Sequence, residues 1–352
     1  MNGKPILSIV MPVFNHSPQV RTMIDSIILN SFQDWELIAV DDGSDEETLR
    51  LLTQYAADDA RIRIIRRDRL PKGAPTCRNI GFGMARGEYT VFFDSDDYVT
   101  PSCLETRVKC IAGRPDLDFL VFPSGIYNEK GFHAEPHLFA FGYPVYKDDV
   151  EHFARRLLPF IVWNNIYRTE ALRRSGVTWD EALLSLQDAD FNVQTLVAGM
   201  RYDYARKCPD YGYRSSTTSS ITKGMRTIEH SKSTVYAMRK MYLTVRTKYG
   251  SRYDKALLYG LFRMYNSIVT GQGVNPQLTQ LFVEGLRDVA PAHARKLQRK
   301  TTLSIALRRV LPVLSPKTAR QLSMLPFLME HGRRQQRKLA AMERLQHPSH
   351  SV

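Results

Sequence analysis

The first half of the chain alternates short apolar runs with longer segments in which apolar residues recur every three to four positions. The apolar runs predict β-strands at residues 6–14, 35–40, 61–65, 89–93 and 117–122. The segments between them have the spacing of amphipathic helices. Alternation of strand and helix at this spacing predicts an α/β fold with a doubly wound, mostly parallel sheet.

Capping residues indicate where helices begin. Ser44 is suited to cap the helix that follows the second strand, and Thr100 with Pro101 suits the N-cap and first position of another helix. Residues 186–199 predict an amphipathic helix that Asp188 opens.

The pattern changes after the fifth strand. Residues 123–160 are rich in Gly, Pro and aromatic residues and predict irregular or hairpin structure, whereas residues 160–172 predict a strand followed by a helix. Residues 210–224 predict a short strand and a Ser/Thr-rich loop. Beyond them the chain is expected to be mostly helical.

Charge divides the chain at the same place. Residues 1–224 contain 26 Lys+Arg and 30 Asp+Glu, a net charge of −4, while residues 225–352 contain 23 and 6, a net charge of +17. An asymmetry of this size predicts two parts with different partners. We therefore expect a domain over residues 1–224 and a basic, mostly helical C-terminal region over residues 225–352.

Composition narrows the class of protein. With 43% hydrophobic and 24% charged residues, the 352-residue chain has ordinary globular composition. Its four cysteines form no C-x-x-C pair, which argues against structural zinc and a disulfide framework. The sequence shows neither a secretory signal nor an uncharged apolar run of membrane-spanning length. We expect a cytoplasmic protein, soluble or peripheral at the inner face of the cell membrane.

Polar clusters follow three of the predicted strands. They are Asn15-His16, Asp41-Asp42 and the three aspartates within residues 94–97. Ligands of doubly wound sheets bind beyond the carboxyl ends of the strands, so these clusters predict a shared site. Alternating carboxylates suit Mg²⁺ or Mn²⁺, which prefer oxygen ligands. The alternative is a solvated turn whose aspartates cap the next helix.

Three stretches resemble the family 2 glycosyltransferases of the GT-A fold. These are "SIVMPVFN" (residues 8–15), "WELIAVDDGSDEET" (35–48) and "CRNIGFGMARGEYTVFFDSDDYV" (77–99). The similarity continues more weakly through "WNNIYRTEAL", "LQDADF" and "YGYRSSTTSSIT", so that it covers roughly residues 6–224. The resemblance implies a GT-A catalytic domain that binds a nucleotide sugar.

The resemblance also implies roles in donor binding. Asp41 or Asp42 would bind the base and ribose, Asp96 would be the metal ligand, and Asp94 would lie nearer the ribose. Asp97 would lie just outside the metal site. The remaining donor-site residues implied are Pro12, Phe14, Asn15 and the pair Arg78 and Asn79, although a structural ion pair is an alternative for Arg78.

Asp188 falls where the family's general base opens a helix. The family usually shows Glu-Asp there, whereas this chain has Gln187 before the aspartate, so the match is incomplete. Asp190 is a competing candidate for the base, and a helix N-cap is the structural alternative for Asp188. An inverting single displacement is implied, in which the base takes the proton of the acceptor hydroxyl.

The implied reaction moves a sugar from a nucleoside diphosphate sugar, expected to be a UDP-sugar, to a hydroxyl of a cell-envelope, surface or lipid-linked glycan. A divalent cation, Mn²⁺ or Mg²⁺, would be the cofactor. The loop 214–223 could close over the diphosphate, with Arg214 or Lys223 as cationic contacts, or be an ordinary exposed loop. Trp163 is expected to be a buried core residue rather than a platform for a sugar.

The basic region matches no family by its sequence. Segments 302–314 and 322–345 mix apolar residues with Arg and Lys and suit an anionic membrane surface. Alternatively, their apolar faces pack on the catalytic domain or a second subunit. Nucleic-acid binding ranks last, because no motif accompanies the charge.

Two other functions compete with the transferase. A sugar nucleotidyltransferase would need a glycine-rich, basic loop after the first strand, where "VFNHSPQV" has neither glycine nor Lys/Arg. A catalytically silent member of the fold, acting in membrane binding or assembly, is the non-enzymatic alternative. The presence of Asp42, Asp94, Asp96 and Asp188 argues against it.

Overall fold

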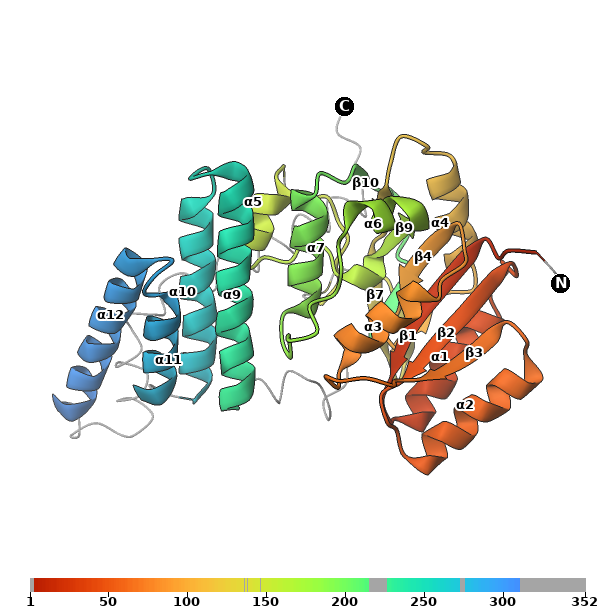
Figure 1. Cartoon of the computed structure of the whole chain (residues 1–352), viewed down its shortest axis with the longest axis horizontal. Helices are drawn as coiled ribbons and strands as arrows, with labels where there is room; N and C mark the ends of the chain where they lie inside the picture. Colours follow the sequence, from red (N-terminus) through yellow and green to blue (C-terminus); the bar gives the residue numbers. More distant parts are fainter. Residues whose placement is uncertain are drawn as a thin grey trace.

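The structure is a computed structural model that describes residues 3–135, 137, 139–145, 147–214, 227–272 and 276–310. An α/β part with two sheets lies beside a helical part formed by the later segments of the chain (Figure 1).

A seven-stranded sheet forms the centre of the α/β part. Its order is β10-β6-β9-β4-β1-β2-β3. The strands are β1 (Leu7–Val13), β2 (Trp35–Asp41), β3 (Ile62–Arg66), β4 (Tyr89–Phe92), β6 (Phe119–Val121), β9 (Asn165–Arg168) and β10 (Tyr202–Tyr204). β1 pairs in parallel with β2 and β4, and β9 lies antiparallel between β4 and β6. The five strands predicted from the first half are present, and the sheet is mostly parallel as predicted.

Helices cover both faces of this sheet, which explains why β1 and β2 are apolar almost throughout. Leu37 and Ala39 of β2 belong to the main hydrophobic core, whereas Ile38 and Val40 belong to a separate cluster with Cys77. The alternation follows from the two-residue period of a strand. The helices are α1 (Ser17–Ile28), α2 (Glu46–Asp58), α3 (Ala74–Gly83), α4 (Cys103–Ala112), α6 (Thr169–Ser175) and α7 (Gln187–Val197).

α3 packs very closely on the sheet at Gly81. A Cβ atom at this position would lie 2.6 Å from Cγ1 of Val10 in β1. Glycine is therefore required for the approach of α3 to the strand, and this approach sets the place of Arg78 one turn earlier in the helix.

A second, four-stranded sheet has the order β5-β11-β7-β8. Its strands are β5 (Tyr98–Val99), β7 (Ser124–Asn128), β8 (Gly131–His133) and β11 (Tyr211–Arg214). β7 and β8 pair antiparallel, which confirms the hairpin expected within residues 123–160. β5 directly follows the acidic turn after β4, so this sheet supports that turn from one side.

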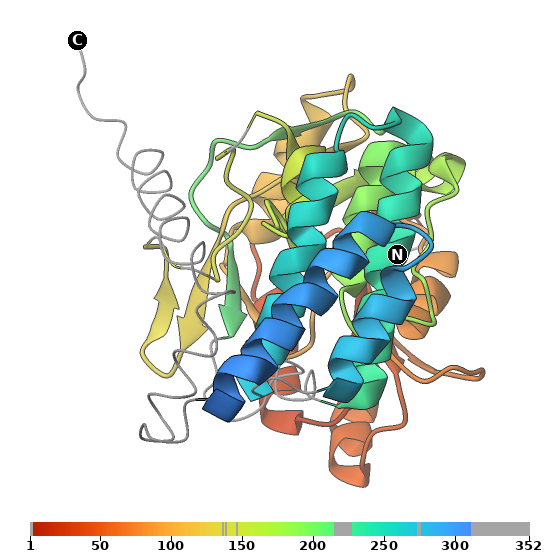
Figure 2. The ribbon, with the colours of Figure 1, turned by 90° about the vertical axis from the view of Figure 1, so that its left-hand side faces the viewer.

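Among the described residues, the helical part consists of four long helices and a shorter one. A 3-10 turn, η1 (Val162–Asn164), belongs to the α/β part. The helices are α5 (Asp149–Ala154), α9 (Ile228–Tyr249), α10 (Asp254–Gln272), α11 (Pro276–Leu286) and α12 (Pro291–Val310). Figure 2 looks onto this part, with α12 nearest the viewer. One continuous hydrophobic cluster runs from β1 to Leu297 of α12. Apolar faces of these helices therefore pack on the α/β part and on one another.

Helical structure beyond residue 224 is confirmed for the residues described. The predicted boundary at 224, the loop residues 215–223 including Lys223, segment 322–345 and the end of segment 302–314 lie outside the described residues. The division into two domains stays a prediction. Within the described part of the chain, no helix is both long and apolar enough to cross a membrane.

Three predicted helix starts were wrong by one or two residues. The N-cap of α2 is Asp45, whose side chain accepts from the Thr48 amide at 2.9 Å, rather than Ser44. α4 begins at Cys103 rather than at Pro101, since Thr100 and Pro101 belong to the preceding turn. Leu186 is the N-cap of α7, so Asp188 lies inside the first turn and does not cap the helix.

Candidate active site

The parallel pairing of β1, β2 and β4 brings their carboxyl ends to one edge of the sheet. Val13 is in register with Asp41, and Val10 with Phe92. The residues that follow these strands, including Asn15, Asp42 and Asp94, are therefore neighbours although they are far apart in the sequence.

The turn after β1 is fastened to the turn after β2 by Asn15. Its backbone amide donates to Oγ of Ser44 at 3.0 Å, and its Oδ1 accepts from the Asp45 amide at 2.9 Å. Asn15 has a positive φ of 57°, a conformation that asparagine tolerates better than most residues. Nearby Phe14 is 43% exposed, and Nζ of Lys72 lies 3.5 Å from the centre of its ring. Pro12 is half-buried in β1.

Both aspartates at the end of β2 have partners within the protein. Buried Asp41 accepts from the amides of Gly43 at 3.2 Å and Ser44 at 3.0 Å, and so shapes the turn. Buried Asp42 pairs with Nε of Arg67 at 2.5 Å and accepts from the Gly73 amide at 3.2 Å. The two carboxylates therefore stabilise the backbone on the β2 side of the site.

Arg78 of α3 forms an ion pair with Asp94 at the end of β4. Its Nη2 lies 2.6 Å from Oδ1 of Asp94, and its Nη1 donates to Gln187 of α7 at 3.3 Å. The guanidinium is buried and lies 4.4 Å from the centre of the Trp179 ring. Burial opposes its charge, but the carboxylates of Asp94 and Asp188 outweigh this and raise the pKa of Arg78. The predicted ion-pair alternative for Arg78 is thus present in the structure.

Asp97 is fixed by the second sheet. Its carboxylate accepts from the Tyr211 hydroxyl and from the Arg214 amide, both at 2.7 Å. Burial, with the neighbouring Asp96 and Asp94, raises the pKa of Asp97 well above its usual range. The side chain supports the acidic turn from inside, in keeping with its predicted place beside the metal site.

Asp96 is the exposed member of this acidic cluster. Arg214 donates its Nε–H to the backbone carbonyl of Asp96 rather than to its carboxylate. Although the Asp96 side chain reaches the surface, the protein around it limits its hydration, and this effect together with the charge of Asp94 raises the pKa of Asp96. The charge of this carboxylate is therefore poorly compensated by the protein itself.

A divalent cation fits this arrangement. Among the described residues, no three His, Cys, Asp or Glu side chains converge in a way that could hold a metal alone. Mg²⁺ and Mn²⁺ are, however, commonly bound by one or two carboxylates together with substrate phosphates. The exposed carboxylate of Asp96, whose charge is repelled by Asp94, is the side chain suited to such a shared site.

Asp188 approaches the same edge from the first turn of α7. Its Oδ1 atom is buried and has no hydrogen-bond partner among the described residues. Burial raises the pKa of Asp188 to about 6, Arg78 opposes this rise, and Asp94 adds to it. A carboxylate with a free oxygen and a pKa near neutrality is suited to accept a proton.

Asp190, the competing candidate, faces away from this edge. Its Oδ2 lies 2.8 Å from Nζ of Lys240 in α9 and accepts from Gln194 at 2.7 Å. Residues two apart on a helix point about 200° apart, so Asp188 and Asp190 cannot face the same side. Asp190 is engaged in packing α7 on α9 and is not available as a base.

Several other side chains support the site. Asn79 donates to the Trp179 carbonyl at 2.9 Å and to Glu181 at 2.7 Å, and so fixes the loop that enters α7. Trp163 is buried and stacks on Tyr211 at 4.8 Å, as expected of a core residue. Sequence reasoning missed Tyr211, which accepts from the Asp94 amide at 3.2 Å and donates to Asp97. No local signal identifies it, because both contacts span more than 100 residues.

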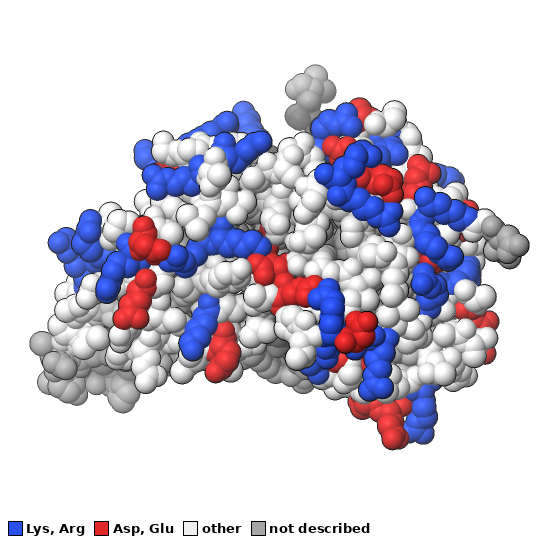
Figure 3. All heavy atoms as spheres, viewed as in Figure 1, with Lys and Arg blue, Asp and Glu red and all other residues white. Residues whose placement is uncertain are grey.

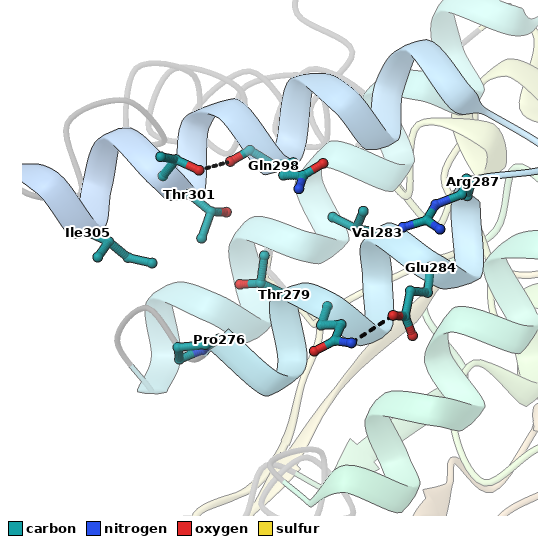
Figure 4. A pocket seen from close by; sticks show the side chains of 10 residues that line it. Pro276, Thr279, Val283, Glu284, Arg287, Gln298, Thr301 and Ile305 are labelled. Atoms are coloured by element: carbon teal, nitrogen blue, oxygen red, sulfur yellow. Dashed lines mark hydrogen bonds between the residues drawn. The ribbon is translucent and has the colours of Figure 1, made fainter.

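A cavity of about 340 Å³ lies between α11 and α12, away from this edge (Figure 4). Two of its polar side chains bond within their own helices, Gln280 to Glu284 and Thr302 to the Gln298 carbonyl. It contains none of the predicted site residues.

Comparison with solved structures identifies the fold. The structure of S. aureus TarS 1–349 in complex with UDP-GlcNAc superposes with a TM-score of 0.65 at 16% identity and covers 98% of this chain and 93% of that one. The mannosyltransferase PcManGT from Pyrobaculum calidifontis, in complex with GDP-Man and Mn²⁺, has a TM-score of 0.50 at 15% identity, with 99% and 89% coverage. The chain has the GT-A fold of nucleotide-sugar transferases.

Sequence comparison shows which family the first half of the chain resembles. The family model for glycosyl transferase family 2 matches residues 8–179. An uncharacterized glycosyltransferase of Bacillus subtilis, EpsJ, is 31% identical over 195 residues, which cover 54% of this chain and 55% of EpsJ. The putative glycosyltransferase EpsH of the same organism is 24% identical, with 69% and 71% coverage. The match thus spans about half of EpsJ. Residues 8–179 of the chain are thus similar to the family 2 glycosyltransferases.

Proposed function

We propose that the protein transfers a sugar from a nucleoside diphosphate sugar to a hydroxyl group of a glycan by an inverting single displacement, with Asp188 as the general base. The observation that supports this most directly is the free, buried Oδ1 of Asp188 beside the Arg78–Asp94 ion pair. This oxygen can accept the acceptor's proton while the acceptor oxygen attacks the anomeric carbon.

The donor would lie along the carboxyl edge of the sheet. Pro12 of β1 and the following Phe14 and Asn15 would line the base pocket, with Asp41 and Asp42 beside the base and ribose. Since the Asp41 and Asp42 side chains already bond within the protein, only their remaining lone pairs can serve the donor. A UDP-sugar is the first donor to test, because the more similar of the two transferase structures contains UDP-GlcNAc.

The diphosphate would lie near the acidic turn after β4. A divalent cation bound by Asp96 would stabilise the negative charge that develops on the departing nucleoside diphosphate. Nη2 of Arg214 is buried without a hydrogen-bond partner among the described residues, which makes it suitable for a phosphate oxygen. Arg78 would hold the Asp94 carboxylate in place on the ribose side.

Incubation of the protein with Mn²⁺ or Mg²⁺ and a panel of nucleotide sugars tests this function. We expect release of nucleoside diphosphate that needs both metal and acceptor, and an inverted anomeric configuration in the product. Metal-independent release, or retention of configuration, would contradict the mechanism. Formation of a nucleotide sugar from a sugar phosphate would instead support the sugar nucleotidyltransferase alternative. If no nucleotide sugar binds in the presence of metal, the catalytically silent alternative would be supported.

The acceptor is proposed to be a cell-envelope, surface or lipid-linked glycan, reached by a cytoplasmic enzyme that binds the anionic inner face of the membrane. α12 supports this, since its sequence contains six Lys or Arg residues and no Asp or Glu, and Leu303 on it is 52% exposed. Sedimentation with anionic vesicles should weaken in the variant with Arg295→Glu and Arg299→Glu. Equal sedimentation of this variant and wild type would exclude α12 as the membrane contact.

A further inference from the structure

We propose that Lys240 of α9 is a positioning residue that fixes the rotation of α7 and thereby the direction of the Asp188 carboxylate. This inference rests on the proposed function, in which Asp188 is the base. It makes a helix of the basic C-terminal region part of the catalytic apparatus.

One face of α9 is polar and is bonded to the segment that leads into α7. Oγ of Ser233 accepts from the backbone amides of Leu184 at 2.8 Å and Ser185 at 3.2 Å. One turn earlier, Nδ1 of His230 lies 2.8 Å from Oγ of Ser185. Residues 230, 233, 236 and 240 follow helical spacing, so they form one stripe along α9.

The other end of this stripe binds two carboxylates. Nζ of Lys240 lies 2.7 Å from Oδ2 of Asp180 and 2.8 Å from Oδ2 of Asp190. The Tyr236 hydroxyl also donates to Oδ2 of Asp180, at 3.0 Å. Figure 3 shows acidic side chains gathered between α7 and α9 on the visible face. One ammonium group thus connects the loop before α7 with the first turn of α7 itself.

Burial makes this connection strong. The side chains of Asp190 and Asp180 are 6% and 14% exposed, and that of Lys240 is 25% exposed. Removal of one partner from a buried ion pair leaves an uncompensated charge, which is far more costly than loss of a surface pair. Without Lys240, α7 would have to shift to hydrate Asp190.

A shift of α7 would move Asp188. The two aspartates point about 200° apart on the same turn, so a rotation that brings Asp190 toward water turns Asp188 away from Arg78. On the opposite side, α3 bonds to the segment through Arg78 and Gln187 and through Asn79 and Trp179. The segment from residue 179 to residue 190 is therefore held between the donor side and α9.

A comparison of Lys240→Met with Arg239→Met tests this role. Arg239 is the adjacent residue on α9, but it pairs with Asp288 and donates to the Gly285 carbonyl at 2.6 Å, within the helical part. For Lys240→Met we expect kcat to fall at least about tenfold, because small displacements of a catalytic group are costly. Donor affinity, measured by titration with UDP-sugar and Mn²⁺, should change by less than about twofold, because the donor-site strands are not touched.

Amide hydrogen exchange gives a readout that does not depend on turnover. Peptides covering residues 180–191 should exchange faster in Lys240→Met than in wild type. Their exchange rate in Arg239→Met should equal that of wild type. Lys240→Arg, which keeps the cation, should restore most of the kcat. Should Lys240→Met not fold, Asp190→Asn removes the same ion pair at lower cost and should show the same separation of kcat from donor affinity.

Two results would overturn the proposal: an unchanged kcat in Lys240→Met, whether or not exchange becomes faster, or an equal loss of kcat in Arg239→Met. Wild-type protein that transfers no sugar would overturn the proposed function alone. In that case the exchange experiment still decides whether Lys240 holds α7 in place. Unchanged exchange in Lys240→Met would then show that it does not.

Discussion

Two acidic clusters on this protein differ in how their charge is compensated. Asp180 and Asp190 both bind Lys240 within 2.8 Å, and further donors come from Tyr236 and Gln194. The cluster after β4 is supplied less well. Asp94 has Arg78, but no Lys or Arg side chain among the described residues forms an ion pair with the carboxylate of Asp96 or Asp97, and Asp97 accepts from a hydroxyl and a backbone amide instead.

The difference separates a structural cluster from the one that we propose to be functional. A carboxylate that only supports the fold is most stable when a lysine or arginine neutralises it in place. A carboxylate meant to bind a cation or accept a proton has to keep an oxygen free, at a cost in folding free energy. Asp188, whose buried oxygen has no described partner, belongs with the second kind.

The largest expected effect is that of Asp188→Asn. Loss of the proposed base should lower turnover by about a thousandfold, within the usual range for general bases. Donor affinity should remain, as measured by titration with UDP-sugar and Mn²⁺. Asp190→Asn on the same turn acts only through the position of α7 and should cost about tenfold. Equal losses in the two variants would remove the distinction between the clusters.

A smaller loss is expected for Asp96→Asn. Because this carboxylate is the proposed metal ligand, metal-dependent donor affinity should fall by about 50-fold, or about 2.4 kcal/mol. The matched control is Asp116→Asn, which removes an exposed carboxylate paired with Arg114 far from the sheet edge. If both variants bind donor as wild type does when Mn²⁺ is present, Asp96 is not a ligand.

The pH dependence of kcat/KM is a further test, and near neutral pH its effect should be small. The pKa of Asp188 is raised to about 6, so kcat/KM should be level above this value and fall about tenfold for each pH unit below it. A profile that stays level down to pH 4.5 would show that a different group takes the proton.

The same raised pKa has a consequence for stability. Because the folded protein holds the proton of Asp188 more tightly than the unfolded chain, this group lowers stability progressively as the pH rises from about 4 to about 6, and the full loss is present above pH 6. Asp188→Asn should therefore be more stable than wild type at pH 7.5, by about 3 kcal/mol, and equally stable below pH 4. Urea unfolding at the two pH values measures this difference.

Much of the fold could be predicted from local patterns. The runs at residues 35–40 and 89–93 are apolar because strands covered on both faces must be, and this signal needs no knowledge of distant residues. Helix starts were less accurate. Ser44 and Asp45 are both good N-cap residues by type. In the structure the Ser44 hydroxyl accepts a hydrogen bond from the Asn15 amide, and Asp45 caps α2.

The acidic residues show the limit of sequence more sharply. Asp188 and Asp190 have the same chemistry two positions apart, and nothing nearby in the chain distinguishes them. Lys240 makes the distinction from 50 residues away by engaging Asp190. Likewise, Arg78 could be read as a donor contact or as a structural partner until α3 brought it to 2.6 Å from Asp94.

The sequence by itself determined the five strands of the first half, their apolar character and the placement of carboxylates at strand ends. These features depend on residue type and on the period of apolar residues along the chain. Only the tertiary structure decided which carboxylates are neutralised and which keep a free oxygen. Compensation of charge requires approach to within about 4 Å, and the partners that achieve it are contributed by segments far apart in the sequence.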